Sequence, residues 1–120
     1  MLAGSWKSAV LTIATDTQNS AAVDLGRGFE NLQVIIPTID SSVVNIKVAD
    51  TLAGTYNLLN HTGINAAGHF LPGTTAGVGG ITALFKLGGF QFIKVYCGTA
   101  QTANRTFTVR GMNPHSRANL

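Results

Sequence analysis

The feature that most constrains this fold is a period-two alternation of apolar and polar side chains over residues 90–98 and 105–111. Such alternation, in β-branched and aromatic residues, is typical of a half-buried strand. The residues expected on the core side are Ile93, Val95, Cys97, Phe107 and Val109. We expect the two segments to form one long β-hairpin. The linker 99–104 is longer than a tight turn, so it leaves the register open.

Shorter segments of the same kind precede this hairpin. The clearest contains an inward row of Val44, Ile46 and Val48. Another ends at Pro37, where a strand should stop because proline lacks a backbone donor. Weaker strand segments cover residues 8–15, 21–25, 56–59 and 81–87. No helix-period segment, fixed repeat or linker stands out. The chain therefore predicts a single-domain, all-β sandwich or barrel of about eight short strands.

The two ends and one internal segment lack a core pattern. We expect an N-terminal arm over residues 1–7, a β-sandwich domain over residues 8–111 and a C-terminal tail over residues 112–120. Trp6 in the arm either folds back on its own domain or anchors the arm in a neighbouring subunit. The glycine-rich segment 60–80 is longer than an ordinary loop. Its apolar island at residues 69–71 is expected to be a short strand or edge piece.

The chain is poor in charge. Only 11% of its 120 residues are charged, against about 25% in an average domain. A surface of Thr, Asn, Ser and Gly is easily covered by another protein, because few charges must be desolvated. Two interpretations stay open: an ordinary β-rich protein, and a subunit covered in an assembly. The net charge of +3 comes from scattered cations, so we expect no nucleic-acid partner.

No constellation of residues predicts catalysis. His61 and His69 have no third metal ligand between them. The carboxylates almost all lie at turns or strand ends, where Asp bends the backbone. Residues 77–80 resemble a phosphate loop, but a strand follows them and the Lys-Ser/Thr pair is missing. We therefore expect no enzymatic activity, no metal and no cofactor.

Cys97 is the single cysteine, so no internal disulfide can form, and its position on the apolar side predicts a buried, inert thiol. No signal-peptide pattern or membrane-spanning run is present in the sequence. We expect a protein that is made in the cytoplasm of its producing cell and kept there until assembly, with no membrane association.

Several of these segments together resemble small virion structural proteins of tailed bacteriophages. The similar segments are Val23-Asp24-Leu25-Gly26, Leu32 to Pro37, Asn45 to Asp50 before Gly54-Thr55-Tyr56, Phe90 to Val95, and Arg105 to Val109. In that group, a strand ending in Pro precedes a strand that runs into a Gly-Thr-Tyr turn. The resemblance covers roughly residues 8–111 by this strand assignment. The glycine-rich segment 60–80 departs from the family pattern, which leaves a position on the head, a connector or a tail open.

The resemblance implies a jelly-roll-like β-sandwich of short antiparallel strands. It also implies that this domain acts as a head decoration or cement protein on the capsid surface of the virion. Its expected partners are the major capsid protein and copies of itself, as a dimer or trimer. The interface residues expected from the two ends and the apolar island are Trp6, Lys7, Phe70, Pro114, Arg117 and Leu120. The alternative is a carbohydrate-binding or adaptor module of a phage tail or fibre. That alternative requires an exposed aromatic platform, for which the candidates are Trp6, Tyr56, Phe70 and Tyr96.

Overall fold

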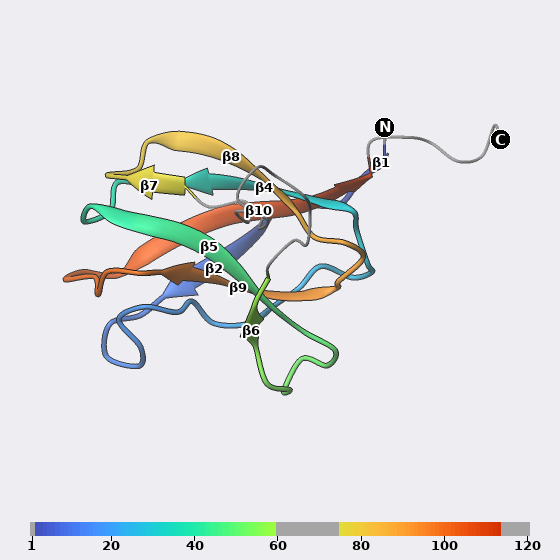
Figure 1. The fold of residues 1–120 in the computed structure, drawn as a ribbon, viewed down its shortest axis with the longest axis horizontal. Coiled ribbons are helices and arrows are strands. Elements are labelled where there is room, and N and C mark those ends of the chain that lie inside the picture. Colours follow the sequence, from blue (N-terminus) through green and yellow to red (C-terminus); the bar gives the residue numbers. More distant parts are fainter. Residues whose placement is uncertain (1, 60–74, 114–120) are drawn as a thin grey trace, which may run out of the picture.

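The structure, a computed structural model, describes residues 2–59 and 75–113. Within those ranges the protein is all-β, with ten short strands and no helix. Figure 1 shows the arrangement of the strands. The strands are β1 (Leu2–Ala3), β2 (Lys7–Leu11), β3 (Val23–Asp24), β4 (Asn31–Ile36), β5 (Ser42–Ala49), β6 (Asn57–Leu58), β7 (Thr75–Gly77), β8 (Ile81–Lys86), β9 (Phe92–Cys97) and β10 (Arg105–Asn113). The predicted single-domain β-sandwich is confirmed.

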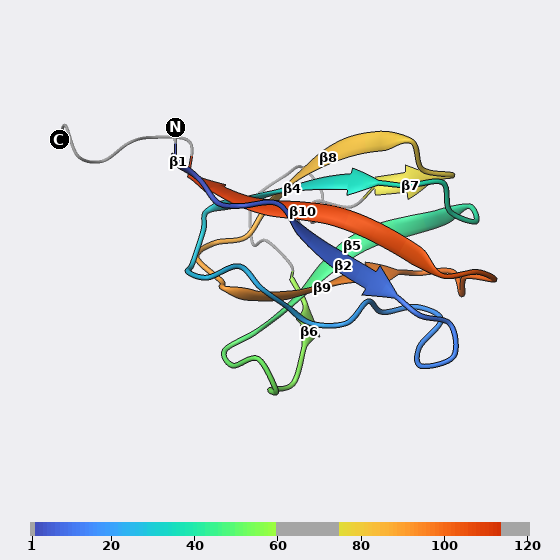
Figure 2. The same ribbon diagram turned by 180° about the vertical axis from the view of Figure 1, so that it is seen from behind.

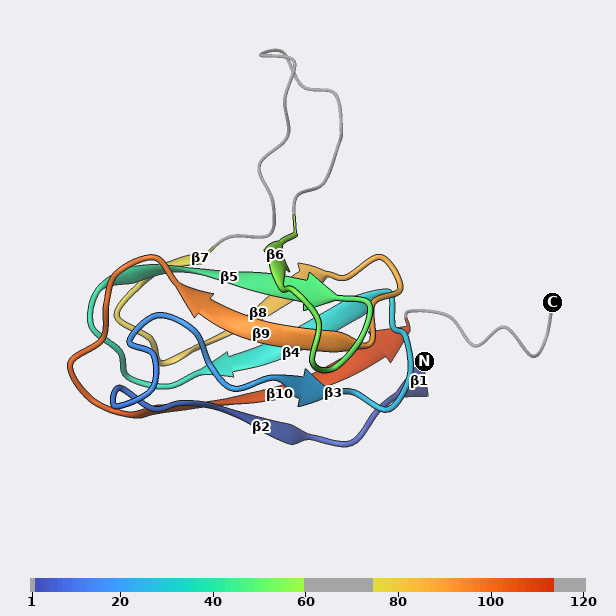
Figure 3. The same ribbon diagram turned by 90° about the horizontal axis from the view of Figure 1, so that it is seen from below.

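The strands form two antiparallel sheets. In the first, called the β10 sheet, the order is β2-β10-β4-β8, with β1 along the same side of β10 as β2. In the second, called the β9 sheet, the order is β3-β9-β5, and β6 and β7 lie along the same side of β5. In Figure 3 both orders run from the bottom of the picture to the top. With β1 and β2 sharing one position and β6 and β7 another, the strand order is that of a jelly roll.

The predicted hairpin of residues 90–111 is wrong in its pairing. β9 pairs with β3 and β5, whereas β10 pairs with β1, β2 and β4 in the other sheet. Residues 98–104 therefore cross from one sheet to the other. The predicted core side is confirmed, because Ile93, Val95, Cys97, Phe107 and Val109 are all 0% exposed. Alternation specifies which side of a strand faces the core, and the inner faces of two packed sheets carry the same alternation.

Hydrogen bonds to Gln101 hold this crossing. Its side chain is only 3% exposed. Its Oε1 accepts from the Asp40 backbone N–H at 2.8 Å and from Arg105 Nε at 3.1 Å. Its Nε2 donates to the Thr99 and Asp40 carbonyl oxygens. The crossing segment is thus tied to the loop between β4 and β5.

The N-terminal segment differs from the expected arm. Leu2 and Ala3 pair with the far end of β10, and Lys7 begins β2 (Figure 2). The Gly4 N–H also donates to the Gly111 carbonyl at 2.8 Å. Residues 2–7 therefore lie along the domain, because backbone groups pair with an open strand edge whatever side chains they carry. At the other end, β10 continues to Asn113, past the expected boundary at residue 111.

The core lies between the two sheets. The predicted row of Val44, Ile46 and Val48 is buried there, and β4 ends directly before Pro37 as expected. The ring of Phe29 packs so closely on Gly111 that a Cβ at position 111 would overlap it. The outward faces of both sheets are left for contact with solvent or partners.

Candidate interaction surface

Of the six predicted interface residues, Trp6 and Lys7 lie in the described part of the chain. Trp6 is 43% exposed, and the Arg110 guanidinium lies 4.4 Å from the centre of its ring. Trp6 therefore packs on its own β10 sheet while leaving much of its ring accessible. Lys7 is held by backbone pairing with Val109. The remaining predicted residues, Phe70, Pro114, Arg117 and Leu120, lie outside the described residues, as do all three histidines and the apolar island 69–71.

The outer face of the β10 sheet, called the β10 face, is formed by alternate residues of four strands. Its central members are Ser8, Val10, Gln33, Ile35, Thr82, Leu84, Lys86, Thr106, Thr108 and Arg110. Three of them are exposed apolar side chains: Val10 at 38%, Ile35 at 41% and Leu84 at 62%. Lys86 and Arg110 are the only charged members of this set, and none of the set is acidic. The sequence alone could have indicated this face, because these three apolar residues occur at positions of the alternation where polar residues are expected.

Arg110 is held in place on the β10 face. Its Nε donates to Gln33 Oε1 at 2.6 Å while its guanidinium stacks on Trp6. Gln33 in turn lies opposite Leu84 in the next strand. These contacts form a continuous row of side chains across the sheet. A partner that covers this row meets an ordered surface, so little side-chain entropy is lost on contact.

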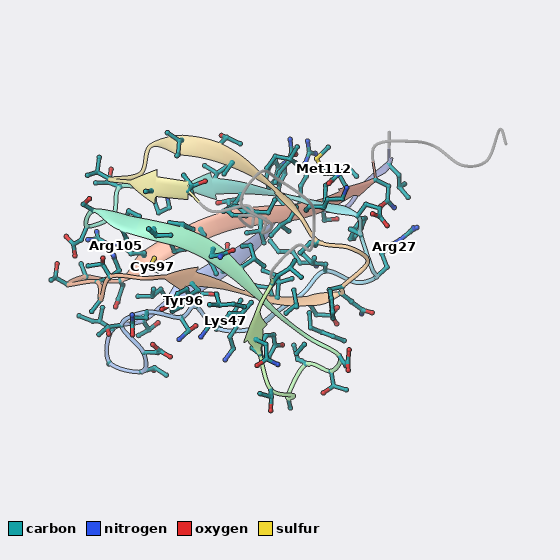
Figure 4. The ribbon with its side chains drawn as sticks, in the orientation of Figure 1. Arg27, Lys47, Tyr96, Cys97, Arg105 and Met112 are labelled. Carbon is teal, nitrogen blue, oxygen red and sulfur yellow. The ribbon has the colours of Figure 1, made fainter. Side chains whose placement is uncertain are left out.

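The outer face of the β9 sheet has a different character. Lys47 and Lys94 lie directly opposite each other on β5 and β9. Like charges in this position repel, but each ammonium group sits over an aromatic ring. Lys47 lies 4.4 Å from the Tyr96 ring centre and Lys94 lies 4.8 Å from that of Tyr56 (Figure 4 labels Lys47 and Tyr96). Cation–π attraction at these distances stabilises the arrangement.

The aromatic residues do not form one platform. Trp6 lies on the β10 face, whereas Tyr56 and Tyr96 lie with the lysines of the β9 sheet. Each of these rings has a cation against it, so part of its face is already used. Burial, followed by the charge of Asp24, raises the pKa of Tyr56, and the Tyr56 hydroxyl donates to the Leu52 carbonyl at 2.8 Å.

Three of the carboxylates stabilise turns, as the sequence indicates. Asp24 accepts hydrogen bonds from the Gln91 side chain and the Gly26 backbone, and these lower its pKa. The Thr102 hydroxyl and backbone lower the pKa of Asp40, with help from Arg105. Burial raises the pKa of Asp16, but hydrogen bonds from Gln18 and Asn19 outweigh it. These carboxylates stay ionised near neutral pH and are engaged in turns.

The hollows of the surface offer no catalytic constellation among the described residues. Two neighbouring hollows of about 300 and 390 Å³ share Ala49, Asp50 and Phe90 in their walls. No group of three His, Cys, Asp or Glu side chains with metal-binding geometry occurs in residues 2–59 and 75–113. Cys97 is fully buried as expected, and desolvation raises its pKa to about 11, so the thiol stays protonated (Figure 4). In the described ranges there is also no helix with the length and apolarity to span a membrane.

The geometry defines a jelly-roll domain with a charge-poor, partly apolar outer face. No protein-family model matches the chain, and no curated protein matches it either. Among solved structures, the chain is similar to the SPBc2 prophage-derived protein YomS, with 15% identity, a TM-score of 0.49 and coverage of 92% of this chain and 97% of that one. It is also similar to a chain of the cyanophage Pam1 capsid asymmetric unit, with 13% identity, a TM-score of 0.32 and coverage of 92% and 84%.

Proposed function

We propose that this protein is a non-enzymatic virion structural protein of a bacteriophage that decorates and cements the head shell. It binds across joints between major capsid subunits and adds buried area where internal pressure would open them. The observation that carries this proposal is the β10 face, a surface of threonines and exposed apolar side chains with no acidic member in its central set. The sequence resemblance to small phage virion proteins supports it.

Covering the β10 face costs little desolvation free energy. Only Lys86 and Arg110 carry charge there, and Arg110 is already partnered by Gln33 and Trp6. Burying the exposed parts of Val10, Ile35 and Leu84 yields about 1 kcal/mol each. One copy would therefore bind weakly. Many copies bound to a shell that also contact one another would bind more firmly, because each contact raises the effective concentration for the next.

The chemistry of the β10 face supports a particular kind of partner surface. The two cations favour a capsid surface that is flat, partly apolar and acidic at its rim. In this proposal the protein is made in the host cytoplasm and binds the capsid surface of the virion, with the major capsid protein and copies of itself as partners. No nucleic acid, cofactor or membrane takes part.

A matched pair of substitutions tests this function. Ile35 on the β10 face and Val43 on the outer face of the β9 sheet both lie in strands and are 41% and 43% exposed. Shells that lack the protein would be mixed with each variant, sedimented, and heated until they open. We expect the wild type and Val43→Glu to bind and raise the opening temperature, and Ile35→Glu to lose at least tenfold in affinity. Equal binding by both variants would refute the role of this face, and no binding by the wild type would refute the function.

A carbohydrate-binding or adaptor module of a tail or fibre is the second candidate. The observation that favours it is the placement of Tyr56 and Tyr96 with Lys47 and Lys94 on one outer face. Selective signals on a glycan array that disappear in Tyr56→Ala, but persist in Trp6→Ala, would support this candidate over shell binding.

A further inference from the structure

The β8 strand forms the one long open sheet edge in the described part of the chain. It pairs with β4 over six residues, and no described strand pairs with its other side. The other sheet edges are short or covered. β3, β6 and β7 have two or three residues each, and the outer side of β2 accepts a hydrogen bond from the Ala21 N–H at the Val10 carbonyl.

The β8 edge lacks the usual protections against pairing. Natural edge strands avoid association with proline, bulges or inward-pointing charges. β8 contains no proline, and its only charged residue is Lys86 at its end. Leu84, near its middle, points outward and is 62% exposed. A row of peptide groups that no described strand pairs with, beside exposed apolar side chains, favours the addition of another strand.

We propose that β8 pairs antiparallel with β8 of a second copy across a two-fold axis at Leu84, which joins two β10 sheets into one. Residues opposite each other in an antiparallel pair lie on the same face. A two-fold pairing that keeps both β10 faces on one side must therefore pair outward residues with outward residues. Centring it on Leu84 sets Leu84 against Leu84 and Thr82 against Lys86 of the other copy.

This register makes the edge complementary to itself. The most exposed apolar side chain of β8 is covered by its own copy. Each Lys86 meets a threonine, and the two Lys86 side chains lie about 14 Å apart along the strands, at about 3.4 Å per residue. That separation exceeds the Debye length of about 8 Å at physiological salt, so the cations do not oppose pairing. Closed two-fold dimers are also the commonest assembly of identical chains.

The inference deepens the self-association that forms part of the proposed function, but it does not depend on shell binding. An edge contact of this length is small compared with a standard stable interface. We therefore expect a dimer that dissociates on dilution and that becomes populated at high concentration or on a shell. If the wild-type protein binds shells but forms no such dimer, the pairing is refuted and the cement role is not. If it forms the dimer but does not bind shells, the cement role is refuted and the pairing is not.

Cysteine crosslinking tests the pairing directly. Opposite Cα atoms in an antiparallel pair lie about 4.5–5.5 Å apart, within the range that a disulfide spans. Leu84→Cys should therefore form a disulfide-linked dimer when diamide accepts the two thiol hydrogens. Ile35→Cys is the matched control, exposed on the same face but one strand farther from the axis. Its counterpart lies about 20 Å away, because the two positions are about 14 Å apart across three strand spacings and about 14 Å apart along the strands. Native Cys97 is fully buried and contributes nothing.

We expect Leu84→Cys to crosslink at least tenfold faster than Ile35→Cys. Equal rates would overturn the proposal, because they report random collision. Sedimentation velocity of two charge variants tests the register. Thr82→Glu sets a carboxylate against Lys86 of the other copy twice and should tighten the dimer about two- to tenfold. Leu84→Lys should weaken it by a similar factor or more. No gain with Thr82→Glu would refute the Leu84-centred register.

Discussion

Gln101 offers the sharpest test of how the two sheets are joined. Gln101→Met keeps the length and volume of the side chain but removes four hydrogen bonds, to the Asp40 N–H, the Asp40 and Thr99 carbonyls, and Arg105 Nε. Because the site is 3% exposed, water cannot easily replace these partners. The crossing of residues 98–104 would then lose two hydrogen bonds to Asp40 in the loop before β5, while the two from Thr102 to Asp40 remain.

The expected loss of unfolding free energy follows from the partners left behind. A buried backbone group left without a partner costs about 1–3 kcal/mol. Arg105 keeps its ion pair with Asp40 at 3.4 Å, so the loss of its hydrogen bond to Gln101 should cost less unfolding free energy. We therefore expect a total of about 2–4 kcal/mol. At about 4 °C per kcal/mol for a domain of this size, the melting temperature falls by roughly 8–16 °C.

Thermal and urea unfolding followed by circular dichroism would measure this loss, with an unchanged urea m-value showing that the two-state transition is retained. Gln91→Met is the matched control, since Gln91 makes one exposed hydrogen bond to Asp24 and should change stability by less than about 0.5 kcal/mol. If Gln101→Met melts within about 2 °C of the wild type, the crossing is not held as the structure indicates.

The other predictions concern pH, the thiol and the core. Asp24 and Asp40 have folded pKa values below their ordinary 3.8, so the unfolded chain takes up protons first. The stability they add is therefore present above about pH 4 and lost as the pH falls through the folded values; acid titration of Asp40→Asn should show a smaller loss. Cys97, with its pKa raised to about 11, should react with a thiol reagent at pH 8 only after unfolding, and rapid labelling of the native protein would contradict its burial. Gly111→Ala drives a Cβ into the Phe29 ring and should cost about 1–3 kcal/mol, part of which Phe29→Leu should restore in a double-mutant cycle.

Sequence alone determined which side of each main strand is buried. The inward rows of β5, β9 and β10, the buried thiol at Cys97 and the end of β4 before Pro37 all follow from local patterns. A period-two alternation is a property of neighbouring residues, and it survives in whichever sheet the strand is placed. For the same reason the all-β sandwich class was predictable.

Tertiary structure alone decided which strands are neighbours. β9 and β10 follow each other in the chain yet lie in different sheets. Leu2–Ala3 pairs with the far end of β10, although no side-chain pattern in these residues predicts a strand. Strand pairing depends on contacts between residues far apart in the chain and on how two inner faces fill one core. The same long-range packing leaves β8 at an edge and separates Trp6 from Tyr56 and Tyr96. The surfaces proposed to bind partners are therefore products of topology, which local alternation does not encode.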